Sequence, residues 1–494
     1  MEYQPRRKGK EKAPSSPSVD NPFISQYRPP PGETEEERIR RARAAQDAQR
    51  VSKEIDESLL ETKKYLDRRR RGLRLLLLGQ AEAGKSTVLK NFQLAFTPSL
   101  FQRERMLWKT IIQLNLIHAV KIILDTLSTP ESPGSPTDSD STLPPSPIFT
   151  SSALSRKHRR LHLSLSPLLS VETNVNKLLS SSRPDSRDVC VRAGSSWKSK
   201  LGFQDSARYS TDSEQGLSSA QAAAMSDLTR MLEASSDDLM ALWADLEVRT
   251  MLASRSGGKF IQNHPGFHFL HDIPRITSPV YVPTDSDIVR ARVRTVGVEE
   301  HHLVGETDSQ KGSDFYITDV GGARNLRSSW VPFFDDGNAS LVVAEGHVAH
   351  TKINLAQAIL FLAPLSFNQM LDEDRRVNRL EDSLMIWRGI CSNALLANCI
   401  LIIFFNKRDL LENTLESGVL VNTYVSSYDG PNDAAHVTKY FKDRFKSYFK
   451  KLSPKPRPFI SYSTSAIDTR AMKALILVVH DGIVRNNLAN SDIL

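Results

Sequence analysis

The sequence is poor in cysteine and has no long uninterrupted hydrophobic run. Its three cysteines, Cys190, Cys391 and Cys399, are scattered through 494 residues and have neither a disulfide-framework nor a zinc-site spacing, so we expect a reducing compartment. No apolar run reaches the roughly 20 residues that a membrane-spanning helix needs, and no signal-peptide pattern is visible. These absences argue against a disulfide-stapled secreted domain and against an integral membrane protein.

Signals for lipid attachment are missing as well. Myristoylation needs Gly after the initiator Met, and residue 2 is Glu2. The net charge is +8, with a basic cluster at residues 68–71. Because no aromatic residues are interleaved with the basic ones, nucleic-acid binding is not expected, and any contact with anionic lipid would be peripheral. We expect a cytoplasmic protein that reaches the plasma membrane only through partners.

Composition divides the chain into helical and low-complexity segments. Residues 1–33 are rich in Pro, Ser and basic residues, which predicts a disordered tail. Residues 34–71 have the composition of a helix with a sparse apolar stripe, which is typical of a partner surface. Low-complexity segments are predicted at 128–150 and 180–218. The helices predicted around them run from Met106 to Leu127, from Leu154 to Leu179 with an interruption at Pro167, and from Ser226, as N-cap, to Leu252.

A glycine-rich loop follows a short apolar run at residues 73–78. Residues 79–86 fit the phosphate-loop pattern G-x-x-x-x-G-K-S, and a helix is predicted directly after them. In such a loop the backbone N–H groups and the helix N-terminus all face one anion. Lys85 is expected to reach the β- and γ-phosphates of a nucleotide, and Ser86 to ligate Mg²⁺. The alternative to a phosphate loop is a glycine-rich turn without function, and the predicted strand before it and helix after it argue against this alternative.

A second motif predicts which base is bound. The apolar run at 397–405 reads as a buried strand, and Asn406, Lys407 and Asp409 follow it at the edge where open α/β sheets bind ligands. A carboxylate there can accept hydrogen bonds from the N1–H and the 2-amino group of guanine. Adenine offers neither donor, so the motif argues against an ATPase.

A third motif predicts a sensor for the γ-phosphate. Asp319 follows the predicted strand 315–318 and would hold Mg²⁺ through water. Gly322 would offer its N–H to the γ-phosphate, because a glycine backbone approaches closely. Loss of that phosphate would release the following segment, which is an order-to-disorder switch.

Together these motifs resemble the alpha subunits of heterotrimeric G proteins, over about residues 35–127 and 240–494. Residues 287–298 are similar to the first switch of that family, and 319–330 to its second switch. The resemblance implies a divergent, fungal-type member with long insertions. Its implied fold is α/β: a Ras-like P-loop GTPase domain, doubly wound around a mostly parallel sheet, with an inserted all-helical domain. The expected ranges are 72–98 with 286–494 for the GTPase domain, 99–285 for the helical domain, and 337–355 for an insertion after the second switch.

The resemblance also implies roles for single residues. Arg292 would be an arginine finger held in cis, Thr295 a second protein ligand of Mg²⁺, and Glu82 the loop acid that pairs with the finger. The backbone N–H of Ala466 would face guanine O6. The implied residues for GTP or GDP are Gly79, Glu82, Ala83, Gly84, Lys85, Ser86, Thr87, Val289, Arg290, Ala291, Arg292, Gly322, Asn406, Lys407, Asp409 and Ala466.

One departure from the family bears on catalysis. The family carries a water-orienting Gln after Asp-Val-Gly-Gly, and here the position is Ala323. An unpositioned nucleophile can cost about 10²-fold or more in rate, so slow GTP hydrolysis is expected. A signalling scaffold with negligible GTPase activity is the alternative that Ala323 favours. The phosphate loop also has Gln80 and Ala81 where the family has Ala-Gly.

The resemblance implies partners too. The N-terminal helix and the second switch would bind a G-protein beta-gamma dimer, and the C-terminal tail would bind a G-protein-coupled receptor. The effector cannot be named from the sequence.

Overall fold

The computed structural model describes residues 32, 34–128, 156–179, 190–192, 219–254, 265–307, 314–333, 342–344, 347–349 and 356–490. The expected tail at 1–33, most of the segments expected at 128–150, 180–218 and 337–355, and the last four residues lie outside these ranges. The chain forms two units, Met1–Arg68 and Arg69–Leu494. In the first unit, α1 (Glu35–Arg71) begins where a helix was predicted, and its exposed apolar residues include Ile39, Ile55 and Leu59.

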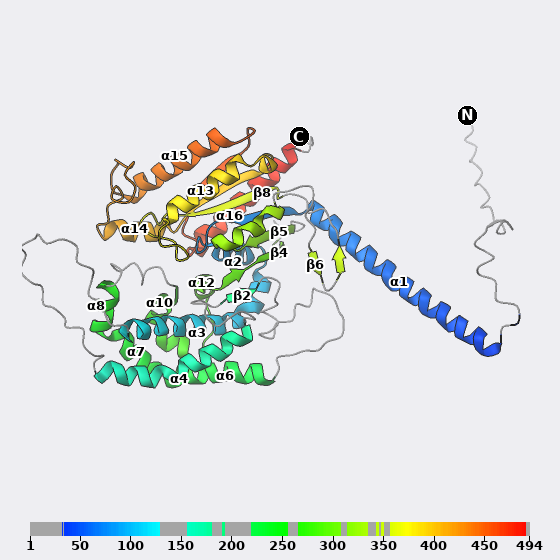
Figure 1. The fold of residues 1–494 in the computed structure, drawn as a ribbon, viewed down its shortest axis with the longest axis horizontal. Coiled ribbons are helices and arrows are strands. Elements are labelled where there is room, and N and C mark those ends of the chain that lie inside the picture. The colour runs from blue at the N-terminus through cyan, green and yellow to red at the C-terminus, as the bar shows by residue number, and fades with distance from the viewer. Residues whose placement is uncertain are drawn as a thin grey trace, which may run out of the picture. The chain divides into compact units, whose positions relative to one another are not determined.

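A six-stranded sheet is the centre of the second unit (Figure 1). Its spatial order is β10-β9-β8-β1-β5-β4, and all neighbours are parallel except β4, which runs antiparallel to β5. Central strands β8 and β9 are buried at every residue, as expected of strands covered on both faces. The strands are β1 (Leu73–Leu78), β4 (Val298–Val304), β5 (Asp314–Val320), β8 (Ala358–Pro364), β9 (Ile400–Asn406) and β10 (Phe459–Ser463).

Helices pack on both faces of this sheet, which confirms the doubly wound prediction. On one face Phe92 of α2 (Lys85–Phe96) and Ile476 of α16 (Thr469–Asn490) share a core with the strands. On the other face the core contains Trp387 of α13 (Arg379–Ser392) and Phe445 of α15 (Ala434–Leu452). The remaining elements of this part are η3 (Arg324–Phe333), η4 (Ala394–Leu396), α14 (Arg408–Glu416), and two small sheets formed by β2 (Cys190–Arg192) with β3 (Arg294–Val296) and by β6 (Val342–Ala344) with β7 (His347–Ala349).

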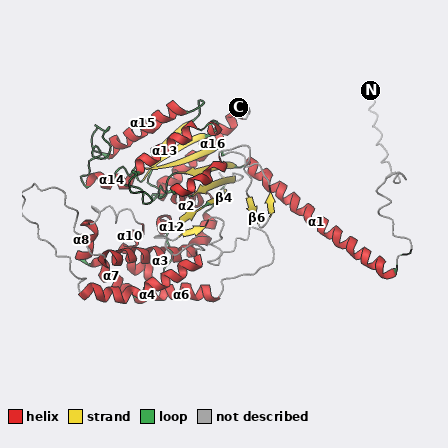
Figure 2. Cartoon of the chain, in the orientation of Figure 1, coloured by secondary structure: helices red, strands yellow, loops and turns green. Residues whose placement is uncertain are grey.

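A helical domain lies between α2 and the strands β4 and β5 in the sequence (Figure 2). Its central helix, α3 (Pro98–Ser128), is long and apolar enough to cross a membrane, yet 72% of its apolar window is buried inside the protein, as in a core helix. The helices around it are α4 (Arg156–Leu179), α6 (Ser219–Ala234), α7 (Ser236–Ala244), α8 (Leu246–Ser254), α10 (Pro265–Phe269), η2 (Leu270–Asp272), α11 (Ile273–Thr277) and α12 (Asp285–Arg290).

Three helix predictions in this domain were wrong in detail. The helix predicted from Met106 to Leu127 begins earlier, at Pro98. The expected interruption at Pro167 does not occur, and α4 continues through it. Proline removes the hydrogen bond to the carbonyl of the residue four positions earlier, Leu163, and this turn lies on the outside of the helix, where Leu163 is 74% exposed. Ser226 is not an N-cap but lies inside α6, because the alanine-rich start of that helix favours helix earlier. Asp245 then interrupts the segment, since its carboxylate accepts from the N–H groups of Glu247 and Val248 at the start of α8.

Candidate nucleotide-binding site

The phosphate loop joins β1 to α2 and requires glycine at two places. Gly79 and Gly84 have φ of 147° and 98°, which side chains disfavour. A Cβ on Gly79 would lie 2.7 Å from the carbonyl oxygen of Leu362, and one on Gly84 would lie 2.3 Å from the Asn406 side chain. The loop is therefore closely packed between β8 and the last residue of β9, and it leads directly into the N-terminus of α2, where helices commonly bind anions.

Lys85 folds back over this loop. Its Nζ donates to the carbonyl oxygens of Gly79 and Gln80, at 2.9 Å each. Burial lowers the pKa of Lys85 to about 8, although the nearby Asp319 raises it. A phosphate bound in the loop would stabilise the charged ammonium, because an added negative charge favours the protonated form.

Ser86 and Asp319 form the predicted metal-binding pair. Ser86 Oγ donates to Asp319 Oδ2 at 3.2 Å, which joins the first turn of α2 to the end of β5. A hydroxyl and a carboxylate are hard oxygen donors of the kind that Mg²⁺ prefers, so these residues fit the ion. Thr295 lies on β3, and its side chain is outside the described residues.

The finger candidate, Arg292, forms an ion pair with Glu82 of the phosphate loop. Glu82 also accepts from Arg379 Nη2 at 2.9 Å. Burial by itself raises the pKa of Glu82, but Arg292 and Arg379 outweigh it and hold this pKa well below its ordinary range. Arg379 was missed as a site residue, although it stands in the family-like stretch 378–383. In this conformation the loop acid holds both guanidinium groups.

Asn115 of α3, also missed, fixes the backbone of Arg292. Its side chain accepts from the Arg292 N–H at 2.6 Å and donates to the Arg292 carbonyl at 3.0 Å. Lys90 of α2 supports the preceding segment, since its Nζ donates to the carbonyls of Ile288 and Ala291 at 2.9 and 2.5 Å. Lys90 thus fastens the C-terminal end of α12 to α2 of the GTPase domain. The residues expected beside the ribose lie at this end of α12: Val289, Arg290 and Ala291.

Replacement of Asn115 by Ala is expected to slow single-turnover GTP hydrolysis about tenfold and to leave GTP affinity nearly unchanged. The variant keeps the Arg292 side chain but removes the two hydrogen bonds that hold the Arg292 backbone. A small displacement of a catalytic group lowers the reaction rate strongly. The matched control is Thr110→Ala on the same buried helix. Equal rates for wild type and Asn115→Ala would contradict the positioning role.

Asp287 anchors the start of the segment that leads to Arg292. It accepts from Arg275 at 2.7 and 2.9 Å, from Tyr281 at 3.0 Å and from the Thr284 N–H at 2.9 Å. Burial alone raises the pKa of Asp287, but these hydrogen bonds, chiefly from Arg275, lower it to about 2. The first switch therefore begins from a fixed, charged anchor.

Asp287→Asn is expected to lower the free energy of unfolding by about 1 kcal/mol at pH 7, because the buried carboxylate loses its charged hydrogen bonds with Arg275, whose partly exposed side chain leaves the pair partly screened by solvent. The folded pKa lies below the unfolded one, so the contribution of Asp287 is fully present above about pH 4 and is lost as the pH falls toward 2. Urea denaturation at pH 7 and pH 3 measures this. A difference between wild type and Asp287→Asn that did not shrink at pH 3 would contradict the assignment.

The guanine motif links three parts of the site. Asn406 donates to the Ala83 carbonyl at 2.9 Å, and its Oδ1 accepts from the Ala466 N–H at 3.0 Å. Asp409 Oδ1 accepts from Ser465 Oγ at 2.7 Å. Burial, followed by the charge of Arg379, lowers the pKa of Lys407 to about 8. The predicted donation from Ala466 to guanine O6 would require that N–H to leave Asn406.

The second switch lies directly against the phosphate loop. A Cβ on Gly322 would come within 2.4 Å of the backbone carbonyl carbon of Gln80, which cannot move aside as a flexible side chain can, so only glycine fits there. Arg327 binds Asp382 of α13 through two hydrogen bonds, of 2.8 and 2.6 Å. Ala323 is 3% exposed and presents only a methyl group. Gly322 thus lies against the phosphate loop, its donation to a γ-phosphate stays a prediction, and an apolar side chain stands where the family has the amide of Gln.

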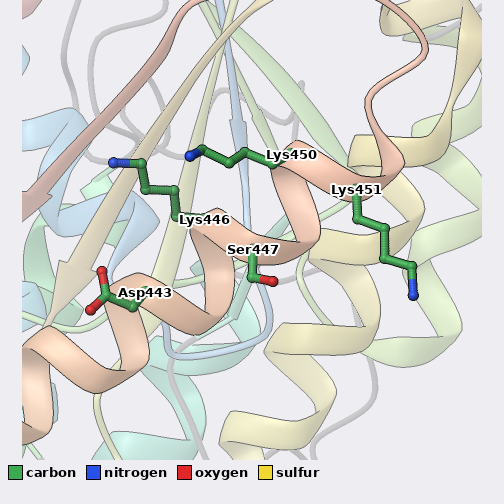
Figure 3. Close-up of a pocket in the computed structure, with 5 residues that line it drawn as sticks. All are labelled: Asp443, Lys446, Ser447, Lys450 and Lys451. Atoms are coloured by element: carbon green, nitrogen blue, oxygen red, sulfur yellow. The ribbon is translucent and has the colours of Figure 1, made fainter.

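A separate hollow lies along α15, away from these motifs (Figure 3). Lys446 and Lys450 extend from the same side of the helix there. The lining residues are Asp443, Lys446, Ser447, Lys450 and Lys451. None of them belongs to the nucleotide motifs, so this hollow is not the candidate site.

The fold and the site define a Ras-like P-loop GTPase with an inserted helical domain. A family model described as the G-protein alpha subunit matches residues 49–483, and the chain belongs to that family. It is a guanine-nucleotide-binding alpha subunit of a heterotrimeric G protein. Members of the family are GTPases that bind GTP and GDP, typically with Mg²⁺, and that generally partner with beta-gamma dimers and receptors.

Two fungal relatives match most of the chain. The chain is similar to the guanine nucleotide-binding protein alpha-4 subunit of Mycosarcoma maydis, with 29% identity over 84% of this chain and 82% of the relative. A guanine nucleotide-binding protein subunit alpha of Candida albicans is 26% identical over 86% of this chain and 91% of its own length. The alpha-15 subunit of Caenorhabditis elegans is 32% identical over 50% of this chain and 62% of its own.

Proposed function

We propose that this alpha subunit relays signals from G-protein-coupled receptors and stays in its GTP state for a long time, because it hydrolyses GTP slowly. The observation that carries the slow rate is Ala323. Its buried methyl group stands where the family has the amide that orients the attacking water. Apart from that position, the residues for phosphate binding and charge stabilisation are present.

The proposed roles are those that the family resemblance implies, and the contacts of Lys85, Arg292, Ser86 and Asp319 support them. Lys85 binds the β- and γ-phosphates once it exchanges loop carbonyls for phosphate oxygens. Arg292 turns from Glu82 to the γ-phosphate, where its charge stabilises the negative charge that develops during transfer. Ser86, Thr295 and, through water, Asp319 would hold Mg²⁺, which supplies further positive charge beside the phosphates. Asp409 selects guanine.

The proposed partners use other surfaces. The exposed apolar residues of α1 and, separately, the second switch are each proposed to contact the beta-gamma dimer. The chain end after α16 is the proposed receptor contact, and the insertion at 337–355 is the proposed modifier of partner choice. We also propose that the protein works at the cytoplasmic face of the plasma membrane through these partners, with the GTPase and helical domains bounded as expected above.

Nucleotide binding and single-turnover chemistry test this function together. The full-length protein with Mg²⁺ should bind a slowly hydrolysed GTP analogue and GDP, and ATP should not compete. Bound GTP should then be hydrolysed measurably but slowly. Binding without hydrolysis, even after residue 323 is changed to Gln, would favour the scaffold alternative. Competition by ATP would contradict the guanine assignment.

A further inference from the structure

Gln80 is the second residue of the phosphate loop, and its polar side chain is destabilising in that buried position. Its side chain is completely buried, and its Oε1 has no hydrogen-bond partner among the described residues. An unpaired buried amide oxygen costs free energy, whereas the Ala found there in the resembled family would cost none. The rest of the side chain must therefore do something that Ala cannot.

The amide nitrogen of Gln80 binds the first turn of α13. Its Nε2 donates to the Arg379 carbonyl at 2.9 Å and to Ser383 Oγ at 2.6 Å. Residues 379 and 383 are one turn apart on the same helix face, so one amide group spans that turn. Both acceptors are buried, and water does not compete for these hydrogen bonds.

The backbone of Gln80 contacts the parts of the site that respond to phosphate. Its carbonyl accepts from Lys85 Nζ at 2.9 Å. A Cβ on Gly322 would lie 2.5 Å from the same carbonyl oxygen. Asp382, on the same turn of α13, binds Arg327 of the second switch. The loop and the second switch are thus both tied to the start of α13.

We propose that Gln80 is a positioning residue that fastens the phosphate loop to α13 and slows the release of bound guanine nucleotide. The proposal rests on the nucleotide site proposed above. The loop grips the phosphates with backbone N–H groups, so they leave readily only if the loop moves. A side chain that ties the loop to a packed helix opposes that movement.

Space filling is the competing explanation, and Gln80→Met separates the two. Methionine has nearly the same length and volume but donates no hydrogen bond, so it preserves packing and removes the tie. Gln113→Met is the matched control. Gln113 is equally buried, and its side chain also makes two hydrogen bonds, to Ile276 and Thr229, but inside the helical domain.

The measurement is the dissociation rate of fluorescently labelled GDP from the full-length protein with Mg²⁺. Gln80→Met should release GDP about 5- to 150-fold faster than wild type, the range expected for two buried hydrogen bonds. Ser383→Ala should have a smaller effect in the same direction. The double variant should be no faster than Gln80→Met, because the two changes remove a shared contact. Gln113→Met should release GDP at the wild-type rate.

Wild-type release rates in both Gln80→Met and Ser383→Ala would overturn the proposal. Ser383→Ala changes no residue of the loop, so it decides the matter if Gln80→Met does not fold. Acceleration by Gln113→Met as large as that by Gln80→Met would also overturn it, because general loosening would then explain the result. A wild-type protein that bound no GDP would instead overturn the nucleotide site, and this inference with it.

Discussion

Ala323→Gln is expected to increase single-turnover GTP hydrolysis about 100-fold. The substitution restores an amide directly after Gly322, which lies against the phosphate loop. An amide there can hold the attacking water in line with the γ-phosphate, and positioning of a nucleophile is worth about 10²-fold or more. GTP affinity should change little, because the nucleotide contacts are untouched. The rate is measured with preloaded GTP after addition of Mg²⁺.

Two companion variants decide whether the gain is catalytic. Arg292→Ala in the Ala323→Gln background should remove most of the gain, because the repositioned water still needs charge stabilisation by the finger. Ser328→Gln adds an amide side chain at an exposed position of the same segment and should leave the rate unchanged. If Ala323→Gln hydrolysed GTP no faster than wild type, the explanation based on residue 323 would be wrong.

Asp409→Asn is expected to weaken GTP binding about 10³-fold or more. Its carboxylate is the proposed acceptor for two guanine donors, and a site built to hydrogen-bond a ligand discriminates on the order of 10⁴-fold when the match is lost. The asparagine amide can instead donate to an oxygen, so xanthosine triphosphate, with an oxygen at C2, should gain affinity. Competition against labelled GDP measures both changes.

The control for this variant is Asp443→Asn, which makes the same chemical change on the outer surface of α15. It should leave both affinities unaltered. Ser465→Ala should have an intermediate effect, because Ser465 orients Asp409 with a 2.7 Å hydrogen bond. Undiminished GTP binding by Asp409→Asn would show that another group reads the base.

The family, the fold class and the main motifs could be predicted from the sequence, because they depend on local patterns. A phosphate loop needs glycines at fixed spacing, and a buried parallel strand needs a continuous apolar run. The loop before Lys85 and the strand before Asn406 therefore stood where expected. Helix ends in the inserted domain were less predictable, since the solvent exposure around Pro167 and the cap by Asp245 depend on packing.

Only the tertiary structure decided how the motifs are joined. Arg379 and Asn115 lie far along the chain from the residues they hold, Glu82 and Arg292, and although Arg379 stands in a family-like stretch, no local pattern shows which residue either one contacts. The sequence shows Gln80 only as a departure from the family pattern. The structure shows that its amide nitrogen binds α13. The sequence by itself determined which chemical groups are present. The fold decided which of them meet, because long-range hydrogen bonds are specified by packing and not by spacing.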